Sequence, residues 1–288
     1  GEKLNFTEKI SFPSVGDDIP NDLLKSLFNN IALILGISYW KLYCPKDIKI
    51  KNFSLSKEQA DFWNIVYAKG LGEFFYKNKI DFRGFVQFPY VNKLTSPISF
   101  PRKDRVLLGL GGGKDSIVSS EILKKENKEF DVLILDTEIQ KDVAMTMNKK
   151  PIVIKRELDP KLFDLNSKEG TYNGHIPISA IYAFLGLMAS VFYNYNKVVV
   201  GNEKSANYGN VEYLGEVINH QWSKSEEFEK LFQKYITKFI TPSISYYSPL
   251  RKLDELEITK EFVKYSKYFR VFSSCNRNFR INEPLDST

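Results

Sequence analysis

The stretch Leu108-Gly109-Leu110-Gly111-Gly112-Gly113-Lys114-Asp115-Ser116 decides the fold of this chain. The apolar segment 105–110 is typical of a buried strand, and 115–125 has the composition of its crossover helix. Doubly wound α/β proteins bind phosphate at such a turn, because glycines let backbone amides approach an anion and the helix start adds its positive dipole end. The stretch therefore predicts a parallel sheet covered by helices, with an anionic ligand at the turn.

The spacing within this turn excludes the two commonest phosphate-binding motifs. A Walker A loop needs Ser or Thr directly after Gly-Lys, but Asp115 follows Lys114. A GxGxxG motif that starts at Gly109 needs glycine at position 114. What remains is another kind of nucleotide loop, or a glycine-rich turn that binds no ligand.

The segments after residue 100 continue the alternation of strand and helix that a parallel sheet requires. We expect strands at 131–136, 151–154, 197–201 and 267–272, and helices at 176–195, 226–240 and 253–265. Tyr246-Tyr247 is interpreted as part of the core. Together these segments predict an α/β domain over residues 101–288.

The segments before residue 100 have a different texture. Apolar residues at helical spacing predict helices at 22–39 and 56–76, and shorter β-like pieces lie at 47–53 and 82–88. Pro97 and Pro101 oppose helix continuation and mark a boundary. We therefore expect a smaller α+β domain over residues 1–100.

The composition is that of an ordinary globular protein. With 288 residues, 43% hydrophobic and 26% charged, the chain can bury a real core, and collagen-like or disordered classes are excluded. Its two cysteines, Cys44 and Cys275, exclude a disulfide scaffold and a four-cysteine zinc site within the chain. No run approaches the about 18 consecutive apolar residues of a membrane span. Without an apolar signal segment at the start, these features predict a cytoplasmic protein with no membrane partner.

The net charge of +6 admits an anionic ligand or nucleic acid, although a general excess of lysine explains it without any partner. Polar clusters at 173–177, 201–207 and 219–225 lie near the ends of predicted strands or the starts of predicted helices, and 274–277 follows the last predicted strand. That edge is where a parallel sheet keeps its ligands. We expect the clusters to meet there.

The turn resembles the PP-loop of the ATP pyrophosphatase superfamily, Ser-Gly-Gly-x-Asp-Ser, with Gly111 in place of the first serine. Together with the polar clusters and segments 36–41 and 70–74, it makes most of the chain similar to the MurL family of ATP-dependent UDP-N-acetylmuramoyl-L-alanyl-L-glutamate epimerases. The resemblance implies a Rossmann-like PP-loop fold, ATP and Mg²⁺ as cofactors, a UDP-linked muropeptide as substrate and no nucleic-acid partner. It also implies a C-x-x-C tail, whereas this chain ends at Thr288.

The resemblance implies a role for each residue of the turn. Gly111, Gly112, Gly113 and Lys114 would hold the departing phosphates, Ser116 would contact one of them, and Asp115 would place Mg²⁺. Asp136 would contact the adenosine, or is simply the turn residue that ends a strand.

The implied reaction inverts the terminal L-glutamate through an acyl adenylate and releases AMP and diphosphate. Adenylation removes the carboxylate charge, so the Cα proton becomes acidic enough for a base to remove it and an acid to return one to the other face. The proton-transfer and catalytic candidates are Cys275, His175, His220 and Lys204. The substrate-contact candidates are Asn202, Glu203, Ser205, Gln221, Ser223, Lys224, Asn276 and Arg277.

Several alternatives stay open. A lone cysteine is often a small buried hydrophobe, and a two-thiol mechanism would have to bring Cys44 to Cys275. The chain could instead be a PP-loop ligase, an amidotransferase or a tRNA-modifying enzyme that adenylates another acceptor. It could also be a nucleotide-binding regulator without turnover, which the glycine at position 111 favours. The sequence does not fix the oligomeric state.

Overall fold

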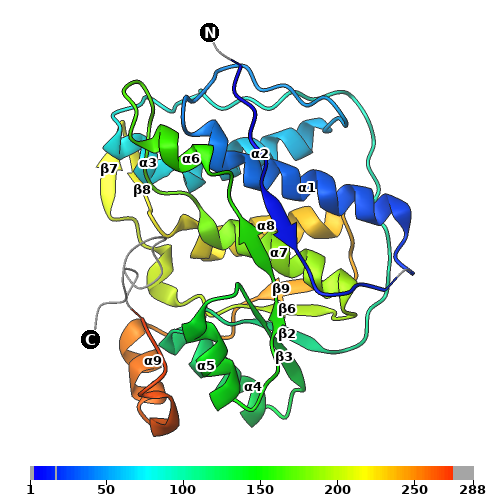
Figure 1. Cartoon of the computed structure of the whole chain (residues 1–288), viewed down its shortest axis with the longest axis vertical. Helices are drawn as coiled ribbons and strands as arrows, with labels where there is room; N and C mark the ends of the chain where they lie inside the picture. Colours follow the sequence, from blue (N-terminus) through cyan, green and yellow to red (C-terminus); the bar gives the residue numbers. More distant parts are fainter. Residues whose placement is uncertain (1–2, 17, 275–288) are drawn as a thin grey trace.

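A parallel sheet between two helical layers organises the computed structural model, which describes residues 3–16 and 18–274 (Figure 1). Its five strands lie in the order β4-β3-β2-β6-β9, and every neighbouring pair is parallel. They are β2 (Val106–Gly109), β3 (Phe130–Ile134), β4 (Ile152–Val153), β6 (Lys197–Val199) and β9 (Ser245–Tyr247). This confirms the predicted α/β class with a parallel sheet.

Side chains alternate across the sheet and so build two separate cores. Leu107, Val198 and Tyr246 enter one buried cluster, while their chain neighbours Leu108 and Val199 enter the other. Successive residues of a strand point to opposite faces, so nearly continuous apolar strands are buried on both sides. The sheet therefore needs helices on both faces.

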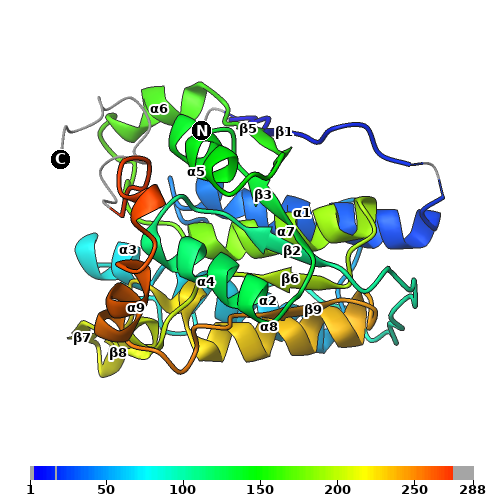
Figure 2. The same ribbon diagram turned by 90° about the horizontal axis from the view of Figure 1, so that it is seen from below.

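The two helical layers are visible above and below the sheet in Figure 1 and from below in Figure 2. One layer packs α1 (Asn21–Trp40), α2 (Lys57–Gly70), α7 (Ile178–Phe192) and α8 (Glu226–Phe239) in the larger cluster. The other packs α4 (Lys114–Lys125), α5 (Glu138–Thr146) and α9 (Glu255–Phe262). The remaining helical segments are α3 (Gly72–Lys77), α6 (Lys161–Asn166) and the 3₁₀ turns η1 (Lys204–Asn207), η2 (Trp222–Lys224) and η3 (Ser266–Tyr268).

Two small antiparallel sheets complete the structure. One pairs β1 (Lys9–Ser11) with β5 (Lys155–Glu157), and the other is the hairpin of β7 (Val211–Tyr213) and β8 (Glu216–Ile218). The hairpin lies next to α3, which β8 contacts (Figure 1).

Three predicted strands are wrong. Residues 47–53 and 82–88 are irregular, and the amide of Phe88 donates to the side chain of Asn64 at 2.8 Å instead of to a strand. Residues 267–272 turn through η3, because the buried Tyr268 ring packs under α4 and its hydroxyl donates to Glu121 at 2.7 Å. A short apolar alternation fits an anchored turn as well as a strand.

The division at residue 100 stays a prediction. The larger buried cluster includes Leu27 and Trp63 from before that point and Phe184 and Phe232 from after it. Within the described residues, α1 alone is long and apolar enough to cross a membrane by length and composition; half of that stretch is buried inside the fold, and α1 contacts α7.

Candidate functional site

The strand order reverses between β2 and β6, and this places the site. From β2 the chain moves outward through β3 to β4, and then returns to the other side of β2 to add β6 and β9. Two neighbouring parallel strands whose connections leave in opposite directions open a crevice at their carboxyl ends, which is where such sheets bind ligands. The loops of this crevice are residues 110–113 and 200–203.

The three glycines of the first loop have different steric surroundings. Gly112 has a φ of +87°, and a Cβ there would lie 2.8 Å from a methyl carbon of Ile139. A Cβ on Gly113 would lie 3.2 Å from the carbonyl oxygen of Ser273, whereas one on Gly111 would meet nothing within 4 Å. Gly112 is thus required by backbone and packing, while Gly111 has room for the serine of the PP-loop pattern.

Four charged side chains gather where α4 begins. Lys114 Nζ lies 3.3 Å from Asp115 Oδ1 and 3.3 Å from Glu255 Oε1. Burial alone would lower the pKa of Lys114, but the charges of Asp115 and Glu255 outweigh it and raise that pKa. Burial, reinforced by the same two carboxylates, raises the pKa of Glu203. Lys114 is therefore a firmly charged cation among carboxylates.

Gly201 brings the second loop against the first helix, and the sequence analysis did not assign it a role. A Cβ at this position would lie 2.9 Å from the carbonyl carbon of Asp115 and 3.0 Å from the amide nitrogen of Ser116. The next residue, Asn202, is buried and exchanges two hydrogen bonds with Ser248 Oγ, at 2.9 and 2.7 Å. The loop that carries Glu203 is thereby fixed against the start of α4.

These residues fit a nucleotide and a divalent cation. Asp115 Oδ1 is buried without a hydrogen-bond partner among the described residues, since its contact with Lys114 is an ion pair only. The described ranges hold no group of three His, Cys, Asp or Glu that would bind a metal alone. Mg²⁺ commonly uses one or two carboxylates together with substrate phosphates and waters, and Asp115 and Glu203 can supply such a pair.

Two serines attach the loop to its surroundings. Ser116 is buried, and its hydroxyl donates to the carbonyl oxygen of Gly113 at 2.9 Å, so it closes the first turn of α4. The amide of Lys114 donates to Ser274 Oγ at 3.2 Å, and the amide of Ser273 donates to the carbonyl oxygen of Gly112 at 3.1 Å. Segment 273–274 therefore lies directly on the glycine loop.

Asp136 follows β3 at the same edge of the sheet. Its φ is +53°, and its carboxylate lies 2.8 Å from Lys141 Nζ and 3.6 Å from Lys155 Nζ. The hydrogen bond from Lys141 lowers the pKa of Asp136. This position is compatible with an adenosine contact and with a turn residue that ends a strand. The adenosine contact stays a prediction.

The two histidines lie around one carboxylate that the sequence analysis did not assign. His175 Nδ1 lies 3.7 Å from Glu73 Oε2, and the charges of both His175 and His220 act on Glu73. Gln221 Nε2 lies 3.3 Å from His220 Nε2. The structure thus brings polar clusters 173–177 and 219–225 together at α3.

Arg251 joins the remaining polar loops and was also missed. Its guanidinium donates to the carbonyl oxygens of Lys224, at 2.9 Å, and Glu203, at 3.4 Å, and pairs with Glu229. Arg251 follows β9, so recognising the fifth strand would have placed it at the ligand edge. The two polar loops are therefore tied together behind the site.

The other predicted contacts differ in exposure. Ser205 Oγ donates to Glu203 Oε2 at 3.3 Å, and Ser223 is buried. The side chain of Lys204 is exposed, while its amide donates to the carbonyl oxygen of Leu253 at 2.9 Å. Their roles stay predictions.

The predicted residues Cys275, Asn276 and Arg277 lie outside the described residues. Cys44 is buried, and burial raises the pKa of its thiol to about 12. A thiol in that state is protonated at neutral pH, which disfavours the two-thiol mechanism.

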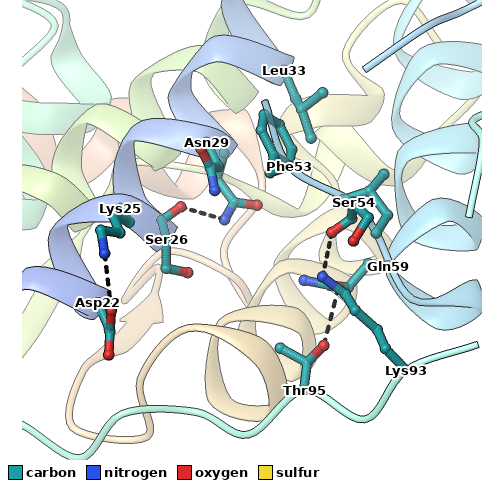
Figure 3. A pocket seen from close by; sticks show the side chains of 12 residues that line it. Asp22, Lys25, Ser26, Asn29, Leu33, Phe53, Ser54, Gln59, Lys93 and Thr95 are labelled. Atoms are coloured by element: carbon teal, nitrogen blue, oxygen red, sulfur yellow. Dashed lines mark hydrogen bonds and ion pairs between the residues drawn. The ribbon is translucent and has the colours of Figure 1, made fainter. Parts of the chain in front are cut away.

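A hollow of about 180 Å³ lies away from these loops, beside the start of α1 (Figure 3). Its polar groups bond to one another: Lys25 pairs with Asp22, Lys93 donates to the carbonyl oxygen of Ser54, and Thr95 donates to Gln59. None of the predicted site residues lines it.

Comparison with known proteins gives consistent matches. A sequence profile described as the MurL N-terminal domain matches residues 1–249. A protein of Xanthomonas oryzae pv. oryzae named UDP-N-acetyl-alpha-D-muramoyl-L-alanyl-L-glutamate epimerase is 38% identical over 254 residues, covering 87% of this chain and 56% of its own length. A protein of Micromonospora sp. with the same name is 32% identical over 293 residues, covering 96% of this chain and 63% of its own length.

The chain thus spans between 56% and 63% of the length of these two relatives. A solved structure described as a predicted subunit of a tRNA methyltransferase from Methanocaldococcus jannaschii is 18% identical, with a TM-score of 0.35, over 56% of this chain and 74% of that one. A likeness at that level supports no conclusion about function.

Proposed function

Because the chain belongs to the family of the MurL N-terminal domain, we propose that it inverts the terminal L-glutamate of UDP-MurNAc-L-Ala-L-Glu in an ATP-dependent reaction. The reaction passes through an acyl adenylate and releases AMP and diphosphate, as in peptidoglycan precursor synthesis. Its setting is the cytoplasm, with no nucleic acid or membrane as partner. The fold is proposed to be that of the PP-loop superfamily.

One observation carries the proposal. At the reversal of strand order, a glycine loop presents a charged Lys114 and the buried Oδ1 of Asp115, which the Lys114 ion pair contacts but no described hydrogen bond satisfies, to the same crevice as Glu203. A cation at the start of a 12-residue helix suits a polyphosphate. Because the ion pair with Lys114 is its one described polar contact, Asp115 Oδ1 keeps lone pairs that a bound cation could use.

The residues divide the work by charge. Lys114 and the amides of the loop would neutralise the departing diphosphate, while Asp115 and Glu203 would hold Mg²⁺. Bound Mg²⁺ would supply further charge neutralisation on the phosphates. Gly201 and Arg251 would keep the Glu203 loop at its place beside α4. Lys204, Ser205 and Lys224 on the adjoining loops are proposed to face the sugar-peptide.

The Asp115→Ala variant tests the proposal. AMP and diphosphate formation from ATP is measured with the UDP-linked dipeptide, with other carboxylates and with tRNA as acceptors. We expect turnover with the UDP-linked dipeptide and at least a hundredfold loss in Asp115→Ala, on the order of the loss seen when one stabilising group is removed from an active site. The matched control is Asp104→Ala, because Asp104 is exposed and precedes the opposite end of β2.

Each result decides between the candidate functions. Turnover only with tRNA or another carboxylate would establish a different adenylating enzyme. Nucleotide binding without turnover by any acceptor would establish a regulator. Full activity of Asp115→Ala would refute the assignment of the site.

A further inference from the structure

A second polar cluster lies around Glu73, on α3. Glu73 is 18% exposed and receives Lys77 Nζ at 2.5 Å, which leaves its Oε2 turned toward His175 Nδ1 at 3.7 Å. Burial would raise the pKa of Glu73, but Lys77 and the two histidines outweigh it and lower that pKa. Glu73 is therefore an anion held beside an imidazole.

The segment before His175 is anchored from two sides. Lys41 is buried, and its Nζ donates to Asn173 Oδ1 and to the carbonyl oxygen of Gly174, each at 3.1 Å. Asn78 Nδ2 donates to the carbonyl oxygen of Asn173 at 3.1 Å. Because Lys41 makes its two described side-chain hydrogen bonds with residues 173 and 174, its buried amine acts mainly on this segment.

His175 is held in its uncharged form by these surroundings. Burial lowers its pKa, the Glu73 carboxylate partly opposes this, and the positive charges of His220, Lys77 and Lys41 lower it further. An uncharged imidazole at neutral pH is able to accept a proton.

In His220, one ring nitrogen has a partner within the fold and the other has none among the described residues. The side-chain amide of Gln221 lies 3.3 Å from Nε2 of His220, so this ring nitrogen has a partner within the fold. Nδ1 of the same ring is buried and has no hydrogen-bond partner among the residues described. A buried polar atom without a partner is disfavoured unless a ligand satisfies it.

The histidine cluster and the glycine loop border the same segment. Asn219, next to His220, donates from Nδ2 to the carbonyl oxygen of Ala206 at 2.8 Å. Ala206 belongs to η1, which directly follows Glu203. The charges of Asp115 and Glu255 help to raise the pKa of Glu203, so Glu203 lies near the glycine loop. Segment 203–206 therefore connects the Glu203 loop to the residue next to His220.

We propose that His175 and His220 transfer the protons of the epimerisation and that Glu73 and Lys41 are their positioning residues. This inference rests on the proposed function. His175 accepts the Cα proton: the C–H bond breaks, its electron pair stays on Cα and is delocalised into the activated acyl carbonyl, and an N–H bond forms. His220, protonated, gives its proton to the opposite face. His175 then returns one proton to water and His220 takes one up, so the pair is reset.

The first test needs no activity, because the chain contains only two histidines. NMR titration of the two Cε1–H signals, assigned with His175→Gln and His220→Gln, gives both pKa values. We expect Glu73→Gln to lower the pKa of His175 further and His220→Gln to raise it. The control is Glu58→Gln, because Glu58 is exposed on α2 and pairs with Lys238, away from the cluster. An unchanged His175 pKa in Glu73→Gln would overturn the positioning role of Glu73.

The second test follows the protons in D₂O with ATP and the UDP-linked dipeptide. We expect His220→Gln to incorporate deuterium into the L-substrate without forming product, and His175→Gln to do neither. Both should lose epimerisation by about 10²- to 10⁴-fold, while AMP formation is retained. Glu73→Gln should move the acid limb of the kcat/KM profile to lower pH, and Lys41→Met should lower kcat more than it changes KM.

The outcomes separate the two proposals. Absence of AMP formation by the unaltered chain with every acceptor would defeat the proposed function, whatever the histidines do. Normal AMP formation together with unimpaired epimerisation in either histidine variant would overturn the present inference alone.

Discussion

Gly201→Ala is the sharpest test of how the site is built. Gly201 lies outside the glycine loop, yet its absent Cβ would approach three backbone atoms of Asp115 and Ser116 at 2.9 to 3.0 Å. Backbone atoms at the start of a helix cannot rotate away as a side chain can. The substitution must therefore push the Gly201 loop and α4 apart.

The expected cost follows from that overlap. Overpacking of a tight contact by one methyl group costs about 1–3 kcal/mol. Replacing glycine by alanine restricts the unfolded chain and returns about 0.4–1 kcal/mol where the backbone tolerates it. The net loss of unfolding free energy then lies between about 0 and 2.6 kcal/mol, with a centre near about 1.3 kcal/mol. ATP should also bind more weakly, because the start of α4 and the Glu203 loop separate.

Urea denaturation measures the stability change, and calorimetry with ATP and Mg²⁺ measures the binding. The slope of unfolding free energy against urea should be unchanged. The matched control is Gly109→Ala, since the nearest atoms to a Cβ at Gly109, on Val199 and Val200, lie at 3.7 Å. If Gly201→Ala is as stable as Gly109→Ala and binds ATP equally well, the close packing of loop and helix does not support the site.

Two further predictions concern the loop and the buried amine. Gly112→Ala should lower the unfolding free energy by about 1–2 kcal/mol for its left-handed backbone alone. Gly111→Ala, with nothing within 4 Å of its Cβ, should unfold at the same temperature as the unaltered chain. Equal unfolding temperatures for the two variants would contradict the geometry of the loop. Burial lowers the pKa of Lys41 from 10.5 to about 8, so above pH 8 the unfolded chain binds the extra proton and native stability rises with pH. Between pH 8 and 9 the unfolding free energy should increase relative to Lys41→Met by up to about 1.4 kcal/mol per pH unit, and a flat difference would show that the amine is solvated.

The central strands could be predicted because consecutive apolar residues are enough to indicate a buried strand. Segments such as 105–110 and 131–136 are apolar over several residues, and this holds whichever strands they pair with. β9 was not predicted, because its three residues become a strand only by pairing Tyr246 with Val198, 48 positions earlier. A strand was wrongly predicted at residues 267–272, because their turn depends on a contact far away in the sequence. The hydroxyl of Tyr268 donates to Glu121 on α4.

The candidate site divides in the same way. The glycine loop was found because its chemistry lies in consecutive residues, and the structure places it at the reversal of strand order. Glu73, Lys41 and Arg251 were not predicted, because each looks like one of many surface charges until the fold brings it to a distant partner. Only close approach of chain segments distinguishes them, and a single sequence does not show which segments approach.

The larger buried cluster has a consequence for handling the protein. Because Trp63 stacks on Phe184 and donates to Tyr235 at 3.1 Å, the helices before residue 100 share their interior with those after it. A fragment starting at residue 101 would expose the aromatic side chains of α7 and α8 to water and should aggregate. A truncated protein for expression should therefore not begin at residue 101.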